Sequence, residues 1–242
     1  MRILRALPGF LSALGLTLTA QQIDKLEEIC GRMRADPLYT SVSKIIDPAE
    51  IATKHFLDSL APLGLGLEIW NGVQKMADIG TGGGFPAIPL SVMFPEAEVW
   101  AIDAKGKSVD FVHRIREDLE LGNLIPRLAR AEELGRDPEV RESFDLVVCR
   151  ALASVRVLVE YCLPLVRVGG NVLLYKGPNL DIELGEARMA FLALDVRPED
   201  IRVFTLKPPR LPFGRGYVTI AKSHPTPAAY PRRNGVPASK PL

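Results

Sequence analysis

The feature that most constrains this chain is a glycine-rich run in its first half, DIGTGGGFP at residues 78–86. It follows an apolar stretch that predicts a strand over 73–79, and it precedes a pattern that predicts a helix over 86–94. Glycines let the backbone turn sharply and let a ligand approach without a Cβ in the way. A glycine turn in this strand-to-helix context is typical of a loop that cradles a cofactor.

The spacing of these glycines distinguishes between cofactors. A dinucleotide fold requires GxGxxG, but here Phe85 stands where the third glycine of that motif would be. A bulky residue there would obstruct helix–strand packing and the approach of a pyrophosphate, which argues against an NAD-dependent oxidoreductase. The Asp-x-Gly-x-Gly-x-Gly form resembles instead the first motif of class I methyltransferases. That resemblance implies S-adenosylmethionine (SAM) as the cofactor, with contacts at Asp78, Gly80, Gly82, Gly84 and Phe85.

Residues at the ends of the next two predicted strands complete the expected cofactor site. Asp103 ends the strand at 98–102 and lies 21 residues beyond Gly82. A carboxylate at this point can accept hydrogen bonds from both hydroxyls of a ribose. The run RAEE at 130–133 follows the third strand. In class I methyltransferases a polar residue here faces the adenine edge, which implies contacts at Ala131 and Glu132.

Strand and helix patterns alternate from residue 73 onward, which is typical of a parallel sheet with helices on both faces. The last two strands, 201–206 and 217–221, have no helix pattern between them and predict an antiparallel pair at the sheet edge. We therefore expect an α/β protein of the class I SAM-dependent methyltransferase (Rossmann-like) fold, with a mostly parallel seven-stranded sheet. The other expected elements are helices over 107–121 and 154–166 and strands over 98–102, 124–129, 144–149 and 171–175.

A helical extension is expected before this domain. A capping box at Thr19 and Gln22 predicts a helix over 20–34, and a second capping signal predicts a helix over 48–60. Glycines and a proline in 62–72 indicate a linker. The chain is thus divided into an N-terminal helical extension (1–72), a SAM-binding methyltransferase domain (73–223) and a basic, Pro-rich C-terminal tail (224–242) whose prolines predict no regular structure.

Positive charge is concentrated toward the C-terminus. Residues 201–242 contain eight Lys and Arg and no acidic side chain, whereas the other 200 residues carry 22 basic and 29 acidic side chains, a net charge of −7. This asymmetry favours a polyanionic partner, although the charges could also serve only to keep a tail soluble. For an RNA partner, the expected phosphate contacts are Lys176, Arg210, Arg215, Arg232, Arg233 and Lys240.

Cysteine and histidine usage argues against a metal centre. The three cysteines form no CxxC pair, and the three histidines are far apart in the sequence. Cys149 lies in an apolar strand and is expected to be a core residue rather than a nucleophile. No apolar run is long enough to cross a membrane, and the stretch over 6–20 resembles a signal peptide only weakly. We expect a cytoplasmic monomer that binds neither a metal nor a membrane.

Taken together, these motifs resemble the bacterial RsmG (GidB) family over nearly the whole chain. The run KHFLDSL at 54–60 is similar to that family's helix signature before the SAM loop, and RALAS at 150–154 to its Arg-Ala-x-Ala run. The pair KG at 176–177 and the tail YPRRNGVPASKPL at 230–242 match two further signatures. The loop DPLYT at 36–40 departs from the family, which often has Trp-Asn there.

The resemblance implies an enzyme that transfers a methyl group from SAM to N7 of a specific guanine in 16S small-subunit rRNA, with Arg150 among the cofactor contacts. Guanine N7 has a free lone pair and no proton, so the reaction needs no general base and depends on alignment and electrostatics. The catalytic residues stay open at this point, with His55, Asp58 and Arg150 as candidates. His55 and Asp58 could equally form a buried polar pair that holds their helix on the domain.

Two other functions are compatible with the same motifs. A class I methyltransferase that acts on another RNA, a small molecule or a protein would share the cofactor loop and Asp103. A non-catalytic RNA-binding protein could keep the fold and the basic tail.

Overall fold

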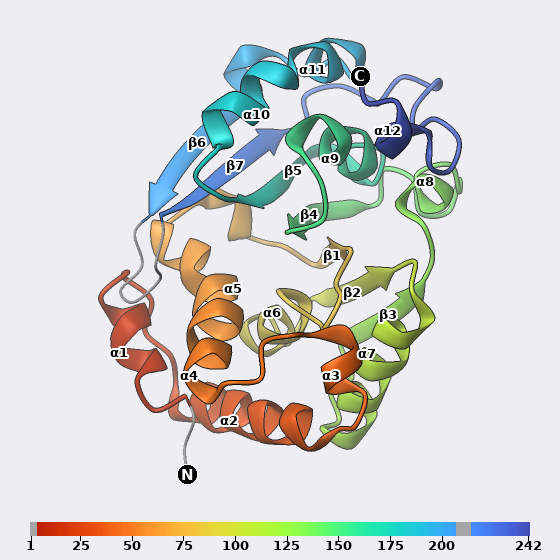
Figure 1. The fold of residues 1–242 in the computed structure, drawn as a ribbon. Coiled ribbons are helices and arrows are strands. Elements are labelled where there is room, and N and C mark those ends of the chain that lie inside the picture. The colour runs from red at the N-terminus through yellow and green to blue at the C-terminus, as the bar shows by residue number, and fades with distance from the viewer. Residues whose placement is uncertain (1–3, 207–213) are drawn as a thin grey trace.

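The computed structural model describes residues 4–206 and 214–242, and it contains a seven-stranded sheet in the order β3-β2-β1-β4-β5-β7-β6 (Figure 1). The first five strands are parallel, and β7 runs antiparallel to both β5 and β6. This confirms the predicted fold, including the antiparallel pair at the edge. The strands are β1 Lys75–Ile79, β2 Glu98–Asp103, β3 Leu124–Leu128, β4 Phe144–Arg150, β5 Val166–Lys176, β6 Ile201–Leu206 and β7 Arg215–Ala221.

The strand order reverses between β1 and β4. From β1 the chain moves to β2 and β3 on one side, and it then returns to place β4 on the other side of β1. At such a switch point the loops that leave the carboxyl ends of the strands diverge and open a crevice where ligands bind. The glycine loop leaves β1, Asp103 ends β2 and Arg150 ends β4, so the topology brings the three predicted cofactor elements to this crevice.

The sheet is covered by helices on both faces because its strands are apolar on both faces. Met76 and Ala77, neighbours in β1, belong to two different core clusters. Figure 1 shows α6 and α7 on the same side as the N-terminal helices, and α9, α10 and α11 on the other. The helices of this domain are α6 Ala87–Met93, α7 Gly106–Asp118, α8 Ala131–Leu134, α9 Val155–Cys162, α10 Leu180–Glu186 and α11 Arg188–Ala193, with the short 3-10 helix η4 Pro198–Asp200.

Two expectations in this region need correction. The helix predicted over 154–166 ends at Cys162, and Val166 already belongs to β5. Pro164 lacks the N–H that the helix would need to continue. The sequence pattern also missed α10 and α11, since several of their large apolar side chains, such as Leu192 and Met189, are exposed and obscure the helical periodicity.

The N-terminal region packs on the face of the sheet that carries α6 and α7. Its helices are α1 Leu7–Ser12, α2 Ala20–Ala35, α3 Tyr39–Val42, α4 Pro48–Glu50, the π-helix η1 Ile51–Leu57, α5 Asp58–Leu60, and the 3-10 helices η2 Ala61–Leu65 and η3 Glu68–Trp70. The capping box at Thr19 and Gln22 is confirmed. Buried side chains of this region share one core cluster with the sheet. The segment 62–72, predicted as a linker, instead forms helical turns that bury Pro62 and Trp70.

The C-terminal tail is also more regular than its prolines predicted. It ends in the helical turn α12 Val236–Ser239, which begins after Gly235 at a φ of +77° and has Pro237 in its first turn. Proline suits the first turn of a helix, since the N–H groups there have no partner in the helix. Arg141 donates to the carbonyls of Thr226 and Tyr230 at 2.6 and 2.8 Å and fixes the tail on the domain.

The other expectations from the sequence concern cysteines, metal sites and membrane-spanning helices. Cys149 is fully buried and donates its thiol to the carbonyl of Ile79 at 3.1 Å, as expected for a core cysteine. Within residues 4–206 and 214–242, no three histidine, cysteine or acidic side chains cluster as a metal site would require. In the same ranges no helix has the length and apolar character to cross a bilayer.

Candidate functional site

The glycine loop after β1 is held against β2 by its own backbone. The N–H groups of Gly80 and Thr81 both donate to the carbonyl of Ile102, at 2.9 and 3.0 Å. Gly80, Gly82 and Gly84 have φ values of +75°, +55° and +86°, which residues other than glycine rarely adopt. A Cβ on Gly84 would also lie 2.2 Å from Ile88 Cδ1, whereas a Cβ on Gly82 would meet no atom within 4 Å. The loop is therefore tightly packed at Gly84 and open at Gly82.

The start of this loop, at Gly80, borders a cavity of about 160 Å³, which Gly82 and Arg150 do not line. Four residues that the sequence predicted for the cofactor line it, namely Gly80, Asp103, Ala131 and Glu132. The cavity is also lined by Lys105, Arg130, Leu152 and Tyr161, which the sequence motifs did not predict as cofactor contacts. A larger cavity of about 510 Å³ lies between residues 65–69 and strands β6 and β7, but it has none of the predicted site residues.

The carboxylate of Asp103 joins the loop to the next helix. Its Oδ2 accepts from the N–H of Gly82 and its Oδ1 from the N–H of Lys105, both at 2.9 Å. Since a carboxylate oxygen has two lone pairs, each oxygen can still accept one more hydrogen bond. An open glycine backbone beside a half-buried carboxylate fits the ribose and methionine parts of SAM, so the residues present suit this cofactor.

Asp78 supports the loop from below. Its side chain is buried, and Oδ2 accepts from the N–H of Ala87 at 3.2 Å. Burial raises the pKa of Asp78 to about 7, because the charged carboxylate is removed from water. Phe85, at the end of the loop, is likewise buried. Both residues shape the site from beneath its surface.

Glu132 links the cavity to the C-terminal tail. It is buried beside the cavity, and its Oε1 accepts from the backbone N–H of Gly235 at 2.8 Å. The sequence suggested a cofactor role for Glu132 but gave no sign of this contact with the tail. The glycine inside the tail signature was the one available hint, because an N–H without a neighbouring side chain can approach a carboxylate closely.

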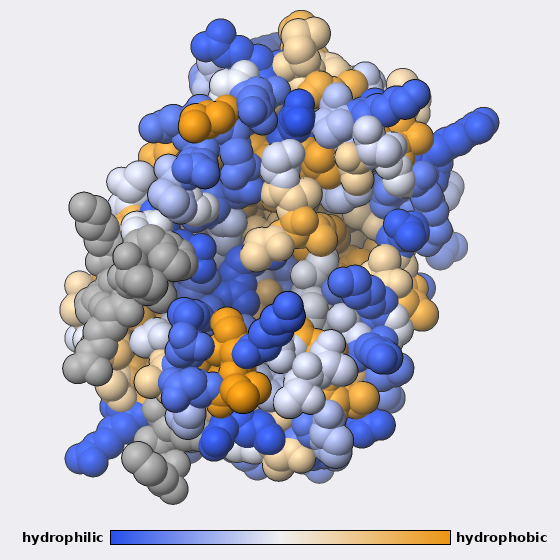
Figure 2. All heavy atoms as spheres, viewed as in Figure 1, coloured by the Kyte–Doolittle hydropathy of each residue, from blue (hydrophilic) through white to orange (hydrophobic). Residues whose placement is uncertain are grey.

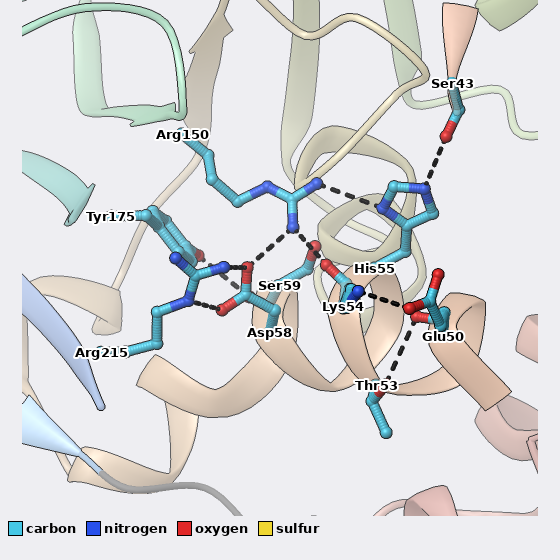
Figure 3. Close-up of polar contacts among 10 residues, drawn as sticks. All are labelled: Ser43, Glu50, Thr53, Lys54, His55, Asp58, Ser59, Arg150, Tyr175 and Arg215. Atoms are coloured by element: carbon cyan, nitrogen blue, oxygen red, sulfur yellow. Dashed lines mark hydrogen bonds and ion pairs between the residues drawn. The ribbon is translucent and has the colours of Figure 1, made fainter. Parts of the chain in front are cut away.

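The three catalytic candidates meet at the end of β4 (Figure 3). Arg150 Nη1 donates to Asp58 Oδ2 at 2.9 Å and to the carbonyl of Lys54 at 2.8 Å, and its Nη2 lies 3.5 Å from His55 Nδ1. Asp58 is fully buried and also accepts from Nε and Nη2 of Arg215, at 2.6 and 2.7 Å. One carboxylate therefore holds two arginines from different strands.

His55 is packed between this cluster and the glycine loop. Its ring stacks on Phe85 with 4.3 Å between centroids and 9° between planes, and its Nε2 lies 3.0 Å from Ser43 Oγ. Burial, helped by the charge of Arg150, lowers the pKa of His55 to about 3. The imidazole is therefore neutral at physiological pH.

The residues predicted to contact RNA phosphates occupy different environments. Lys176 forms an ion pair with Glu183 at 2.6 Å, and Arg215 forms one with Asp58. Arg232 donates from Nε and Nη2 to the buried Glu160. Arg233 and Lys240 are exposed on the tail. Arg210 lies outside the described residues.

Comparisons with known proteins show the family to which this chain belongs. The sequence matches the family described as GidB, rRNA small subunit methyltransferase G, over residues 39–211. It is 39% identical over 231 residues to the ribosomal RNA small subunit methyltransferase G of Desulfitobacterium hafniense, covering 95% of this chain and 93% of that protein. It is also 39% identical over 230 residues to the protein of the same name from Roseiflexus castenholzii, covering 94% and 95%.

Solved structures show the same fold at low sequence identity. An O-methyltransferase from Bacillus cereus in complex with SAH superposes with a TM-score of 0.58 at 17% identity, covering 90% of this chain and 97% of that one. A SAM-dependent methyltransferase from Aquifex aeolicus gives a TM-score of 0.50 at 18% identity, covering 75% and 98%. From its matched length and its identity to these relatives, the chain belongs to the GidB family of SAM-dependent rRNA small subunit methyltransferases.

Proposed function

We propose that this protein transfers the methyl group of SAM to N7 of a specific guanine in 16S small-subunit rRNA. The observation that carries the proposal is that the glycine loop, Asp103 and Arg150 lie at the carboxyl ends of the adjacent strands β1, β2 and β4, in a chain of this family. The first two suit a nucleoside cofactor, and an arginine beside them suits a guanine, whose O6 and N7 are the acceptors that arginine recognises most often.

The cofactor would be held by groups on three strand ends. The backbone of Gly80 and Gly82 would face the methionine and ribose parts, the free lone pairs of Asp103 would accept from ribose hydroxyls, and the backbone at Ala131 and Glu132 would face the adenine. When bound, SAM supplies an electrophilic methyl group on a sulfonium. Asp78 adds negative charge beneath the loop whenever it is ionised.

The chemistry requires alignment rather than proton transfer. The N7 lone pair forms the new bond to the methyl carbon while the electron pair of the carbon–sulfur bond leaves with the sulfur, and no proton is released. His55 is accordingly not needed as a base, and it is unsuited to that role, since its pKa is about 3 and its Nδ1 faces Arg150. The protein contributes by fixing the guanine in line with the departing sulfur.

Contacts to the rRNA backbone would come from exposed cations. Arg233 and Lys240 are exposed on the tail, whereas Lys176 and Arg232 are already engaged by carboxylates. We expect the paired side chains to support the surface and the exposed ones to meet phosphates. Because the proposed substrate is ribosomal RNA, we also propose that the protein acts in the cytoplasm.

Methyl transfer into rRNA from a strain that lacks the gene tests the proposal. Purified protein, labelled SAM and 30S subunits or naked 16S rRNA from that strain should give labelled 7-methylguanosine after nucleoside digestion. RNA from the parent strain, already methylated, should accept far less label. Folded protein that binds SAM but yields no 7-methylguanosine from either substrate would refute the proposed reaction.

A further inference from the structure

We propose that Asp58 and His55 are positioning residues that aim the guanidinium of Arg150 at the acceptor guanine, and that Arg215 belongs to the same unit (Figure 3). This inference rests on the proposed function, because it assigns Arg150 to the RNA side of the methyl-transfer site. While N7 reacts with the methyl group, O6 is the other acceptor on the same edge of guanine, and an arginine can hold it.

Asp58 is the centre of the unit. Its carboxylate has no exposed surface and accepts a two-pronged contact from Arg215 on one side and a single bond from Arg150 on the other. Two guanidiniums share one carboxylate, so the cluster retains one positive charge. Arg150 is the member at the carboxyl end of β4, next to the glycine loop. The retained charge therefore lies where a guanine carbonyl would need it.

The wide turn of η1 provides a second fixed acceptor for Arg150. In an α-helix the N–H of Asp58 would donate to the carbonyl of Lys54, four residues earlier. Here it donates to the carbonyls of Thr53 and His55 instead, and the Lys54 carbonyl accepts from Arg150 Nη1 at 2.8 Å. Single π-helical turns are frequent at functional sites. In this case the turn redirects a backbone carbonyl from the helix to the arginine.

The protonation of His55 follows from its two neighbours. Arg150 is always charged and can only donate, so the His55 Nδ1 that faces it must be the acceptor. The hydrogen of the neutral ring is then on Nε2 and is donated to Ser43 Oγ. The same ring stacks on Phe85, and the guanidinium carbon of Arg150 lies 5.7 Å from the centre of the Phe85 ring. His55 thus restrains Arg150 from a direction that Asp58 does not cover.

Tyrosines of the neighbouring strands β5 and β7 pack beside this unit. Tyr175 donates to the carbonyl of Ser59 at 2.9 Å and fixes α5 beside β5. The rings of Tyr175 and Tyr217 meet edge to face at 5.5 Å, and both are buried close to Asp58. Within the described residues, the hydrogen bonds of Arg150 use both hydrogens of Nη1 and one of Nη2. Its Nε–H and the other Nη2 hydrogen are the donors left for a bound base.

The proposal predicts a specific kinetic defect. If the Arg150 guanidinium is no longer oriented toward the guanine, methyl transfer to bound RNA should slow, because the guanine loses its alignment with the methyl group. The affinity for SAM should change little, since the glycine loop and Asp103 keep their own contacts. A merely structural role for Asp58 would instead lower stability and leave the rate of the folded enzyme unchanged.

The first experiment compares Asp58→Asn with Glu142→Gln in the full chain. Glu142 is a matched control, because it also pairs with a buried cation, Lys222, but lies near the opposite end of β4. We expect Asp58→Asn to lower the single-turnover rate on 16S rRNA at least tenfold while the Kd for SAM, measured by calorimetry, stays within twofold. The Glu142→Gln variant should lose thermal stability and keep its rate within twofold.

A second variant covers the case in which Asp58→Asn does not fold. Arg215→Lys keeps a positive charge beside Asp58 and removes the bidentate contact. The Asp58 side chain can then rotate more freely but still has a cationic partner. We expect a rate about threefold to tenfold below that of the wild type and an unchanged Kd for SAM. A rate equal to that of the wild type would exclude Arg215 from the unit.

The contact from His55 is tested by two amides. Asn at position 55 can place an oxygen where Nδ1 now faces Arg150, whereas Gln reaches toward Ser43 instead. Both remove the stacking on Phe85 equally. We expect His55→Asn to retain several-fold more activity than His55→Gln. Equal losses in the two variants would overturn the assignment.

A measurement independent of activity separates this inference from the proposed reaction. Nitrogen NMR of histidine-labelled protein should show His55 with hydrogen on Nε2 and none on Nδ1, with no titration between pH 5 and 8. A protonated Nδ1, or a SAM affinity that falls as far as the rate in Asp58→Asn, would overturn the positioning role. If instead the wild type forms no 7-methylguanosine while the NMR result holds, the proposed reaction fails and the His55 geometry stands.

Discussion

Two buried carboxylates in this protein bind arginine side chains, but one binds a single arginine and the other binds two. Glu160 in α9 accepts from a single guanidinium, that of Arg232, through three side-chain contacts and from the backbone N–H of the same residue. Asp58 in α5 accepts from two guanidiniums, those of Arg150 and Arg215. Both carboxylates are fully buried.

The two carboxylates also lie in different parts of the molecule. The pair of Glu160 and Arg232 is balanced in charge and attaches the C-terminal tail to the domain. The cluster at Asp58 retains one positive charge and borders the glycine loop. A balanced buried pair is a means of attachment, whereas an unbalanced one presents a directed charge to whatever binds beside it. A carboxylate and an arginine thus serve different purposes in the two places, and the number of arginines per carboxylate decides which.

The largest effect should come from replacing Gly84 and comparing it with Gly235 of the tail. Both have positive φ, +86° and +77°, but only at Gly84 would a Cβ strike another atom, 2.2 Å from Ile88 Cδ1. We expect Gly84→Ala to lower the free energy of unfolding by about 4 kcal/mol, from backbone strain and overpacking together. Gly235→Ala should cost about 1 kcal/mol, from strain alone. Urea unfolding measures both, and equal losses would contradict the difference in packing.

The next effect concerns the shape of the cation at the site. Arg150→Lys keeps the charge but cannot reach Asp58, the Lys54 carbonyl and a base at once. We expect the single-turnover rate to fall about 100-fold, equivalent to about 2.7 kcal/mol in the barrier. Arg202→Lys, on the exposed face of β6, is the control and should stay within twofold. A rate for Arg150→Lys within threefold of the wild type would show that charge alone suffices.

A smaller effect is expected at the balanced pair. Glu160→Gln leaves Arg232 without its counter-charge, but a quarter of that side chain is exposed and can be solvated. We expect the free energy of unfolding to fall by about 2 kcal/mol and the rate of the folded enzyme by less than threefold. A loss of rate comparable to that of Asp58→Asn would remove the distinction between the two carboxylates.

The smallest effect per step measured is a pH dependence from a third buried carboxylate. Asp78 has a pKa of about 7 in the folded chain, raised from 3.8 by burial. Its folded form binds a proton more tightly than the unfolded form, so its contribution to stability is lost as pH rises from about 4 to about 7, by at most about 1.4 kcal/mol per pH unit. Asp78→Asn should therefore gain stability relative to the wild type across that window. Urea unfolding at pH 5, 6, 7 and 8 should show the difference growing up to about pH 7 and then levelling off, and a constant difference would contradict the raised pKa.

Much of this arrangement follows from local sequence. The capping box at Thr19 and Gln22, the apolar strands and the glycine turn depend on residues within a few positions of one another. The strand–helix alternation then fixes the order of the sheet, which is why Gly80, Asp103 and Ala131 could be placed in one crevice beforehand. The family signatures supported the same arrangement and added Arg150.

The partners of the charged side chains could not be predicted in this way. Arg215 and Asp58 are 157 residues apart in the sequence, and Arg232 and Glu160 are 72 apart. The basic C-terminal region predicted RNA contacts for both arginines, yet each also meets a buried carboxylate. A charge count records how many cations a segment has, but not which of them the fold has already neutralised.

The sequence by itself thus determined the sheet, the glycine loop and four of the residues that line the cavity beside it, because these depend on periodicity and on short-range geometry. Only the tertiary structure decided that Asp58 serves two arginines, that Glu132 holds the tail at Gly235, and that the π-turn frees the Lys54 carbonyl. These features depend on burial, which removes water as a partner, so that most buried polar groups pair with others that are distant in the sequence.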